Sequence, residues 1–200
     1  MVYVLHSQGR MHEDIVAFPS AEFYEGSLSC VPLPHQTERS TSPRVQFIDV
    51  MPVAEAVSDK VNTAEAEVIA GIVEQTDPEV SVGIIVPYRS QISAVRNAIM
   101  RRLHTDRGIT IDTVERFQGS QREVIIYGFT VQRHYQLDFL TDNCFVENGK
   151  TIDRKLNVVM TRAMKRLYLV GNRRLLSSVP LYRKLIGTYS VDSKNEETTK

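Results

Sequence analysis

Cysteine, net charge and long apolar runs are all scarce in this sequence of 200 residues. Only two cysteines are present, Cys30 and Cys144, and neither has a close partner along the chain. This argues against a disulfide framework and fits a reducing cytoplasm. No apolar run is long enough to cross a membrane, and residues 1–6 are too short and uncharged for a secretory signal. We therefore expect a cytoplasmic domain without membrane contacts.

An excess of one charge sign is also missing, because 24 Lys and Arg residues balance 24 Asp and Glu residues. This excludes a basic footprint over the whole chain, so any nucleic-acid site must be local. The five histidines and two cysteines show no metal-ligand spacing, and we expect no zinc site. The length and the ordinary hydrophobic fraction suit one domain with a single core.

Strand-like and helix-like patterns alternate along the chain. Apolar and β-branched runs predict strands at 45–50, 82–86, 109–114, 124–129 and 167–170. Helical spacing predicts helices at 15–18 before Pro19, at 66–73 after a capping Asn62, and at 92–103, 156–164 and 181–186. The alternation predicts an α/β fold with a mostly parallel sheet that is covered on both faces.

Three segments fall outside this pattern. Residues 20–43 contain three prolines and are predicted to form an irregular surface excursion. Residues 132–151 form a polar insertion, in which Asn148-Gly149 predicts a hairpin turn. Residues 189–200 are polar, without apolar anchors, and are predicted to be a disordered tail, which leaves 1–188 as the domain.

The sequence lacks the parts that hold the phosphates of a nucleotide. Gly149-Lys150-Thr151 imitates the end of a phosphate-binding loop, but the glycine required five positions earlier is Cys144. No apolar strand leads into this segment, and no strand ends in the paired acidic residues that would hold magnesium. We therefore expect no ATPase activity from this chain alone.

Four segments carry a resemblance to a known family. In chain order they are Gln8-Gly9-Arg10-Met11-His12, 83–91 with Pro87-Tyr88, 113–121, and 156–163. Together they resemble the second, C-terminal RecA-like lobe of superfamily 1 helicases, over most of the chain. The pattern is most similar to the group that contains the nonsense-mediated-decay RNA helicase and the nuclease-helicases of DNA replication. The resemblance implies a RecA-like three-layer sandwich, the fold type of the P-loop NTPases.

The resemblance also implies an ATP site shared with a first lobe that would hold the magnesium ion. It implies that Arg10 and Arg162 reach the γ-phosphate, and that Gln8, Gly119 and Gln121 contact the nucleotide. Arginine suits this role because its planar fork stays charged, and phosphoryl transfer depends mainly on positioning and charge neutralisation. We expect Arg162 on the cleft-facing side of the 156–164 helix, partly exposed and without a carboxylate partner. The alternative for Arg162 is an ordinary surface salt bridge, and Gly119 permits a turn in either case.

By the same resemblance, single-stranded DNA or RNA would contact Thr113, Tyr88, Arg89 and Gln91. Thr113 lies at the end of a predicted parallel strand, where α/β folds place ligands. The alternative is a solvent-exposed threonine that merely favours a strand. Closure of two lobes on ATP, and their opening after hydrolysis, would move a single strand held across both.

Two positions depart from the family pattern. Gly9 stands where the family has an aromatic residue that stacks on adenine, so base recognition is lost or is supplied by Tyr88 or Tyr24. Gln121 stands where the family has a glutamate that binds the ribose hydroxyls, and it keeps an acceptor oxygen without the charge. The departures favour a degenerate lobe that binds nucleic acid or protein without turnover, whereas the intact Thr161-Arg162 favours a helicase lobe. A nucleotide-sensing α/β domain unrelated to unwinding is a third hypothesis.

Overall fold

A five-stranded parallel sheet forms the centre of the chain in the computed structural model, which describes residues 6–51, 58–105 and 108–189. Its strand order is β3-β9-β6-β4-β5. The strands are β3 (Val45–Asp49), β4 (Val82–Ile85), β5 (Ile109–Asp112), β6 (Arg122–Gly128) and β9 (Ala163–Gly171). The predicted α/β class with a parallel sheet is confirmed.

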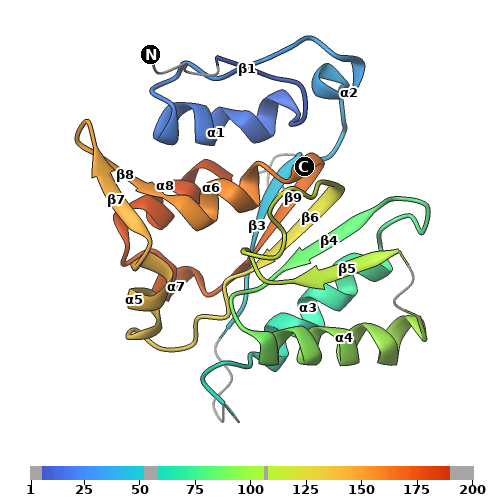
Figure 1. The fold of residues 1–200 in the computed structure, drawn as a ribbon. Helices are drawn as coiled ribbons and strands as arrows, with labels where there is room; N and C mark the ends of the chain where they lie inside the picture. Colours follow the sequence, from blue (N-terminus) through green and yellow to red (C-terminus); the bar gives the residue numbers. More distant parts are fainter. Residues whose placement is uncertain (1–5, 52–57, 106–107, 190–200) are drawn as a thin grey trace, which may run out of the picture.

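Helices cover both faces of this sheet, which gives three layers (Figure 1). On one face, α3 (Thr63–Glu74) and α4 (Arg89–Leu103) pack over a core that includes Ile84 and Ile126. On the other face lie α1 (Glu13–Phe23), α6 (Arg154–Met160) and α8 (Pro180–Tyr189), over a core that includes Ile125 and Leu167. Because side chains alternate along a strand, neighbouring residues of β6 and β9 supply opposite cores.

The segments expected to be irregular contain short elements. Residues 20–43 hold the end of α1, strand β2 (Ser29–Cys30), which pairs with β1 (Ser7–Gln8), and helix α2 (Pro34–Thr37). The insertion holds α5 (Gln136–Thr141) and the antiparallel pair β7 (Cys144–Glu147) and β8 (Lys150–Asp153). A short α7 (Arg173–Leu176) precedes α8. Residues 20–43 and 132–151 are therefore more regular than predicted, and residues 190–200 of the predicted tail lie outside the described residues.

The predicted hairpin turn is confirmed. Asn148 and Gly149 join β7 to β8, and both have positive φ angles, 48° and 76°. Two consecutive residues with positive φ match the twist of a two-residue hairpin, which asparagine and glycine tolerate best.

Helix α1 does not end at Pro19, contrary to the sequence prediction. Proline removes one backbone hydrogen bond, yet the helix continues to Phe23. Phe18 and Phe23 pack edge to face, with ring centroids 6.0 Å apart, and the Ser20 hydroxyl donates to the Leu28 carbonyl at 2.7 Å. The buried last turn offsets the lost bond.

Helix α6 is shorter than predicted, and this moves Arg162 out of the helix. The apolar run at 156–164 predicted one helix, but α6 ends at Met160 and β9 begins at Ala163. The Arg122 amide of β6 donates to the Arg162 carbonyl at 3.1 Å, and Ala163 pairs with Arg122. Sheet pairing therefore fixes the end of the apolar run as a strand, where local pattern cannot distinguish it from a helix.

Candidate functional site

Two arginines from distant segments converge at one edge of the sheet, where β6 and β9 begin. Arg10 follows β1, and its Nε donates to Gln121 Oε1 at 2.7 Å while its Nη1 donates to the Thr161 carbonyl at 2.9 Å. Arg162 lies between α6 and β9, and its guanidinium donates to the carbonyls of Val158 at 3.2 Å and Ser120 at 3.4 Å. The fold thus brings together three of the predicted site residues.

The charge of these arginines is not neutralised locally. Within the described ranges, the two guanidinium groups donate to carbonyl and amide oxygens, and to no carboxylate. Partial burial, and then repulsion from Arg10, lowers the pKa of Arg162. Two half-buried cations held by neutral acceptors form a site that favours an anion such as a phosphate.

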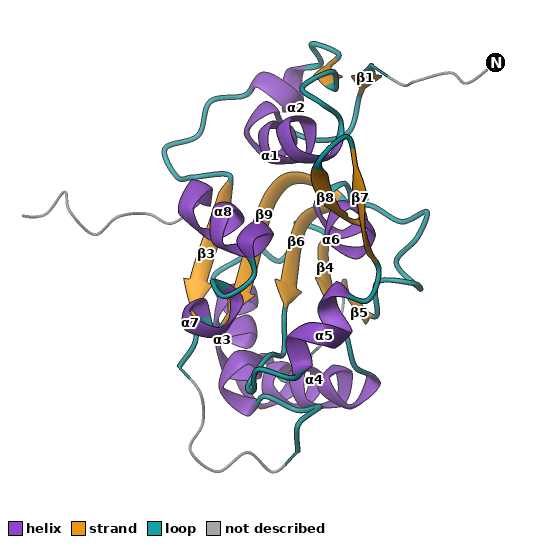
Figure 2. Cartoon of the chain, turned by 90° about the vertical axis from the view of Figure 1, so that its left-hand side faces the viewer, coloured by secondary structure: helices purple, strands orange, loops and turns teal. Residues whose placement is uncertain are grey.

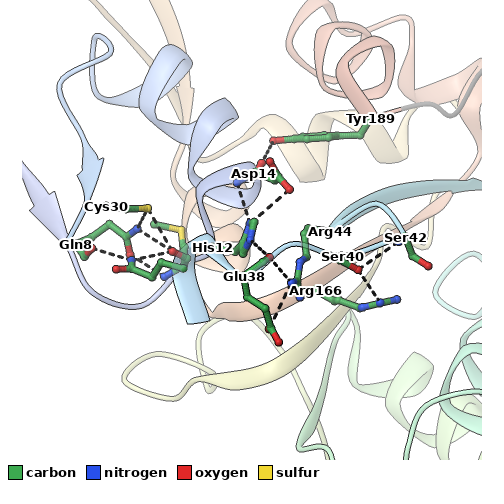
Figure 3. Close-up of polar contacts among 12 residues, drawn as sticks. Gln8, His12, Asp14, Cys30, Glu38, Ser40, Ser42, Arg44, Arg166 and Tyr189 are labelled. Carbon is green, nitrogen blue, oxygen red and sulfur yellow. Dashed lines mark hydrogen bonds and ion pairs between the residues drawn. The ribbon is translucent and has the colours of Figure 1, made fainter. Parts of the chain in front are cut away.

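Gln8 fixes the loop that carries Arg10. Its Oε1 accepts from the backbone amides of Arg10 at 2.8 Å and Met11 at 2.7 Å, and its Nε2 donates to the Met11 carbonyl and to Cys30 Sγ, each at 3.0 Å (Figure 3). The Gln8 side chain therefore bonds to its own loop and to β2. In this arrangement Gln8 positions Arg10, and a direct contact with a nucleotide stays a prediction.

The start of α1 holds the same loop from its other side. His12 Nδ1 accepts from the Asp14 amide at 3.1 Å and caps the helix, while its Nε2 bonds to the Glu38 carbonyl at 2.9 Å (Figure 3). The His12 amide donates to the Met164 carbonyl at 2.9 Å. Since Met164 lies in β9, this bond ties the Arg10 loop to the strand that follows Arg162.

A pocket of about 320 Å³ opens beside Arg10. Gly9 and Tyr24 both line it, together with Thr161. The Tyr24 hydroxyl accepts from Asn157 Nδ2 at 3.0 Å, so its ring is held in place. Tyr24 and Tyr88 are the two tyrosines that could substitute for the missing ring. Tyr24 lines the same pocket as Gly9. Tyr88 follows β4 and stacks on Phe139 instead, with ring centroids 5.0 Å apart.

The segment 113–121 spans the sheet from one edge to the other. Thr113 follows β5 at the carboxyl end of the strands, whereas Gln121 precedes β6 at their amino end. Phe117, in the middle of this segment, is buried and packs against Gly83. A Cβ added to Gly83 would lie 2.7 Å from the Phe117 ring. Gly119 has a φ of 81°, so the predicted turn is confirmed.

The other predicted nucleic-acid residues follow the carboxyl end of β4, at the start of α4. Figure 2 shows α4 near the carboxyl ends of the strands. Tyr88 is the N-cap residue of α4 and Arg89 is its exposed first residue. Gln91 is fully buried, accepts from the Asn62 amide at 2.8 Å and donates to the Asn62 carbonyl at 3.0 Å. Gln91 therefore joins α4 to α3 here, and a nucleic-acid contact would require it to become exposed.

The sequence alone does not identify a buried carboxyl group, that of Glu65 in α3, at the carboxyl end of β6. Glu65 of α3 is fully buried and accepts from the Thr130 amide at 2.9 Å and the Thr130 hydroxyl at 2.9 Å. Burial raises the pKa of Glu65 to about 8. A glutamate in an amphipathic helix gives no sign of this in the sequence, because such residues usually face solvent.

Neither a metal cluster nor a membrane span is found in the described ranges. No group of three or more His, Cys, Asp or Glu side chains there is arranged to hold a metal ion. No helix among the same residues is long and apolar enough to cross a bilayer.

Comparisons with known proteins agree with the fold. The AAA_12 family, described as an AAA domain, matches residues 1–174. The chain is 29% identical over 92% of its length to an uncharacterized ATP-dependent helicase of Methanocaldococcus jannaschii, of which it covers 28%. It is 30% identical over 91% of its length to Regulator of nonsense transcripts 1 of Dictyostelium discoideum, of which it covers 14%. The chain thus spans less than a third of the length of these relatives.

A solved structure shares the fold. The C-terminal domain of a possible DNA helicase from Lactobacillus plantarum superposes with a TM-score of 0.52 at 15% identity, over 92% of this chain and 98% of that one. The RecA-like three-layer arrangement of this chain therefore matches the fold of that C-terminal domain.

Proposed function

Because this chain belongs to the AAA_12 family of AAA domains, we propose that it is the C-terminal motor lobe of an ATP-dependent DNA or RNA helicase. The observation that carries the proposal is the convergence of Arg10 and Arg162 beside Gln121, without a neutralising carboxylate among the described residues. The helicase relatives support the same role.

In this proposal the two arginines stabilise negative charge across an interface with a first lobe. The bound nucleotide supplies the γ-phosphoryl group that is transferred to water. Arg10 is held by Gln121 and the Thr161 carbonyl, and Arg162 by two carbonyls. Both guanidinium groups are therefore positioned before negative charge develops on the phosphoryl group. The first lobe would hold the phosphates and the magnesium ion.

The single strand would bind at the opposite edge, at Thr113, Tyr88 and Arg89. The segment 113–121 then links the two functions, because its first residue lies at the nucleic-acid edge and its last contacts Arg10. When hydrolysis alters the contacts of the arginine pair, this segment would move and shift the bound nucleic-acid strand.

Arg162→Lys tests the proposal in a protein that contains this chain joined to its first lobe. A lysine ammonium cannot reproduce the planar fork, so ATP turnover should fall on the order of a thousandfold while ATP affinity changes little. The measurements are steady-state hydrolysis and nucleotide binding, with thermal unfolding to confirm that the variant is folded.

Arg183→Lys is the matched control, because Arg183 lies on α8, outside the arginine pair, and its Nε donates to the Ser177 carbonyl at 2.7 Å. The control should retain the parental rate. Parental turnover by Arg162→Lys would show that Arg162 is structural. A folded two-lobe protein that binds nucleic acid but never hydrolyses ATP would instead favour the degenerate binding module.

A further inference from the structure

A group of exposed aromatic side chains lies at the carboxyl end of the sheet, on the insertion between β6 and α6. Tyr135 is the N-cap residue of α5 and Phe139 lies four residues later in that helix, so both rings lie on one side of it, and they are 56% and 40% exposed. The Phe139 ring stacks on Tyr88, with 24° between the planes. The insertion thereby extends the surface already expected around Tyr88.

Cations accompany these rings. Lys155 Nζ lies 4.7 Å from the Phe139 ring centroid, and Arg154 Cζ lies 4.6 Å from the Phe145 centroid. Both cations are in the first turn of α6. Arg154 and Arg89 are exposed, and neither pairs with a carboxylate in the described ranges. We call the set of Tyr88, Tyr135, Phe139, Phe145, Arg89, Arg154 and Lys155 the aromatic–basic surface.

The position of the aromatic–basic surface connects it to Thr113. Lys155 Nζ lies 3.9 Å from a carboxylate oxygen of Glu115, two residues after Thr113, and 3.6 Å from one of Asp142. The surface is therefore at the edge where α/β folds bind ligands, away from the arginine pair.

Exposed rings interleaved with arginines match the chemistry of a single nucleic-acid strand, because bases stack on rings while phosphates pair with cations. We infer that the aromatic–basic surface stacks the bases of single-stranded DNA or RNA, with Tyr135 as the ring that contacts a base directly. This inference rests on the proposed helicase role and adds residues of the insertion to the strand-binding site.

The absence of tryptophan from the sequence makes the inference directly testable. Tyr135→Trp places a single tryptophan at the proposed contact, and its fluorescence should be quenched when this chain binds oligo(dT) or oligo(U) at low salt. Met100→Trp is the control, because Met100 is 41% exposed but lies near the far end of α4. Binding itself is measured separately, by the anisotropy of a labelled oligonucleotide.

Phe139→Leu and Tyr135→Ser should each weaken binding about five- to tenfold, as expected for the loss of one stacked base. Quenching at position 135 but not at position 100, with this loss of affinity, supports the inference. Oligonucleotide binding without quenching, or with unchanged affinity in folded variants, overturns it and leaves the helicase proposal intact. Absence of any binding by this chain also overturns it, as does capture of a protein partner in place of the strand. The Arg162→Lys experiment tests the helicase proposal independently.

Discussion

In the proposed nucleotide site, Gly9 has no ring that could stack on a base. An added Cβ at Gly9 would meet only Leu33 Cδ1, at 3.4 Å, so a larger side chain fits there with a small adjustment. Tyr24 lines the same pocket and is fixed by its bond to Asn157, whereas Tyr88 is engaged with Phe139 at the other edge. Tyr24, unlike Tyr88, therefore lies in the pocket beside Gly9.

The residue-scale prediction concerns nucleotide selectivity in the two-lobe protein. If no ring holds the base, kcat/KM should differ little between ATP and GTP, and Gly9→Tyr should raise the ATP preference roughly three- to tenfold through stacking. A strong ATP preference in the unmodified protein contradicts this. Tyr24→Leu should then abolish the preference, while Tyr88→Leu, measured with saturating nucleic acid, should not.

Single-residue roles were only partly predictable from the sequence. Arg10 and Arg162 were identified by pattern, but their shared contact region depends on Gln121, which is 111 residues from Arg10. Gln91 was identified as a nucleic-acid contact, yet both ends of its amide bond to Asn62. A motif gives the residue type at a position, whereas exposure is decided by elements that pack from elsewhere in the chain.

At the scale of elements, Glu65 joins three of them. Glu65 lies in α3, and its carboxylate accepts from the amide of Thr130, just after β6. Its Oε1 lies 3.5 Å from Nε2 of Gln91, in α4. An added Cβ at Gly128 would come within 2.5 Å of its Oε1, so glycine is required for this close approach. Burial, rather than any charged partner, is the first cause of the raised pKa of Glu65.

Glu65 should make stability depend on pH in the unusual direction for a carboxyl group. Its pKa is about 8 in the folded chain and near 4.5 when unfolded, so the folded state binds the proton more tightly. The stabilisation is fully present below pH 4.5 and is lost as the pH rises towards 8, with a total on the order of 5 kcal/mol. Urea unfolding at several pH values between 5 and 8 measures this loss.

Glu65→Gln, which stays neutral, should flatten this dependence. Glu67→Gln is the comparison variant, because the pKa of Glu67 is lowered, first by its bond to Arg101. Its contribution is present above pH 4.5 and is lost in acid, so it should leave the fall between pH 5 and 8 unchanged. An equal slope in the parent and in Glu65→Gln would show that Glu65 is already ionised.

Whole elements were the most predictable level of the structure. Fully apolar runs identified β4, the Asn62 cap located the start of α3, and Asn148-Gly149 located the β7–β8 turn. The errors occurred where long-range contacts outweigh local pattern. Pairing between β6 and β9 ends α6 early, and packing of Phe18 on Phe23 carries α1 past Pro19.

At the scale of the whole molecule, the two edges of the sheet have separate chemistry. The amino end carries the arginine pair, whereas the carboxyl end carries Thr113 and the aromatic–basic surface. The segment 113–121 joins them, anchored by buried Phe117. In the two-lobe proposal, the first lobe would complete the nucleotide site around the arginine pair.

The last prediction follows from this division. This chain alone should show no measurable ATPase activity, because the arginine pair stabilises charge on a phosphoryl group that a first lobe must hold. A lobe with a phosphate loop and a magnesium-binding acidic strand should restore turnover when joined to this chain. Hydrolysis is measured with and without nucleic acid, and a purified Arg10→Ala, Arg162→Ala double variant reports the background from contaminating ATPases. Turnover by the unmodified chain above that background would mean that these arginines act on a triphosphate held by this chain itself, and the two-lobe proposal would fail.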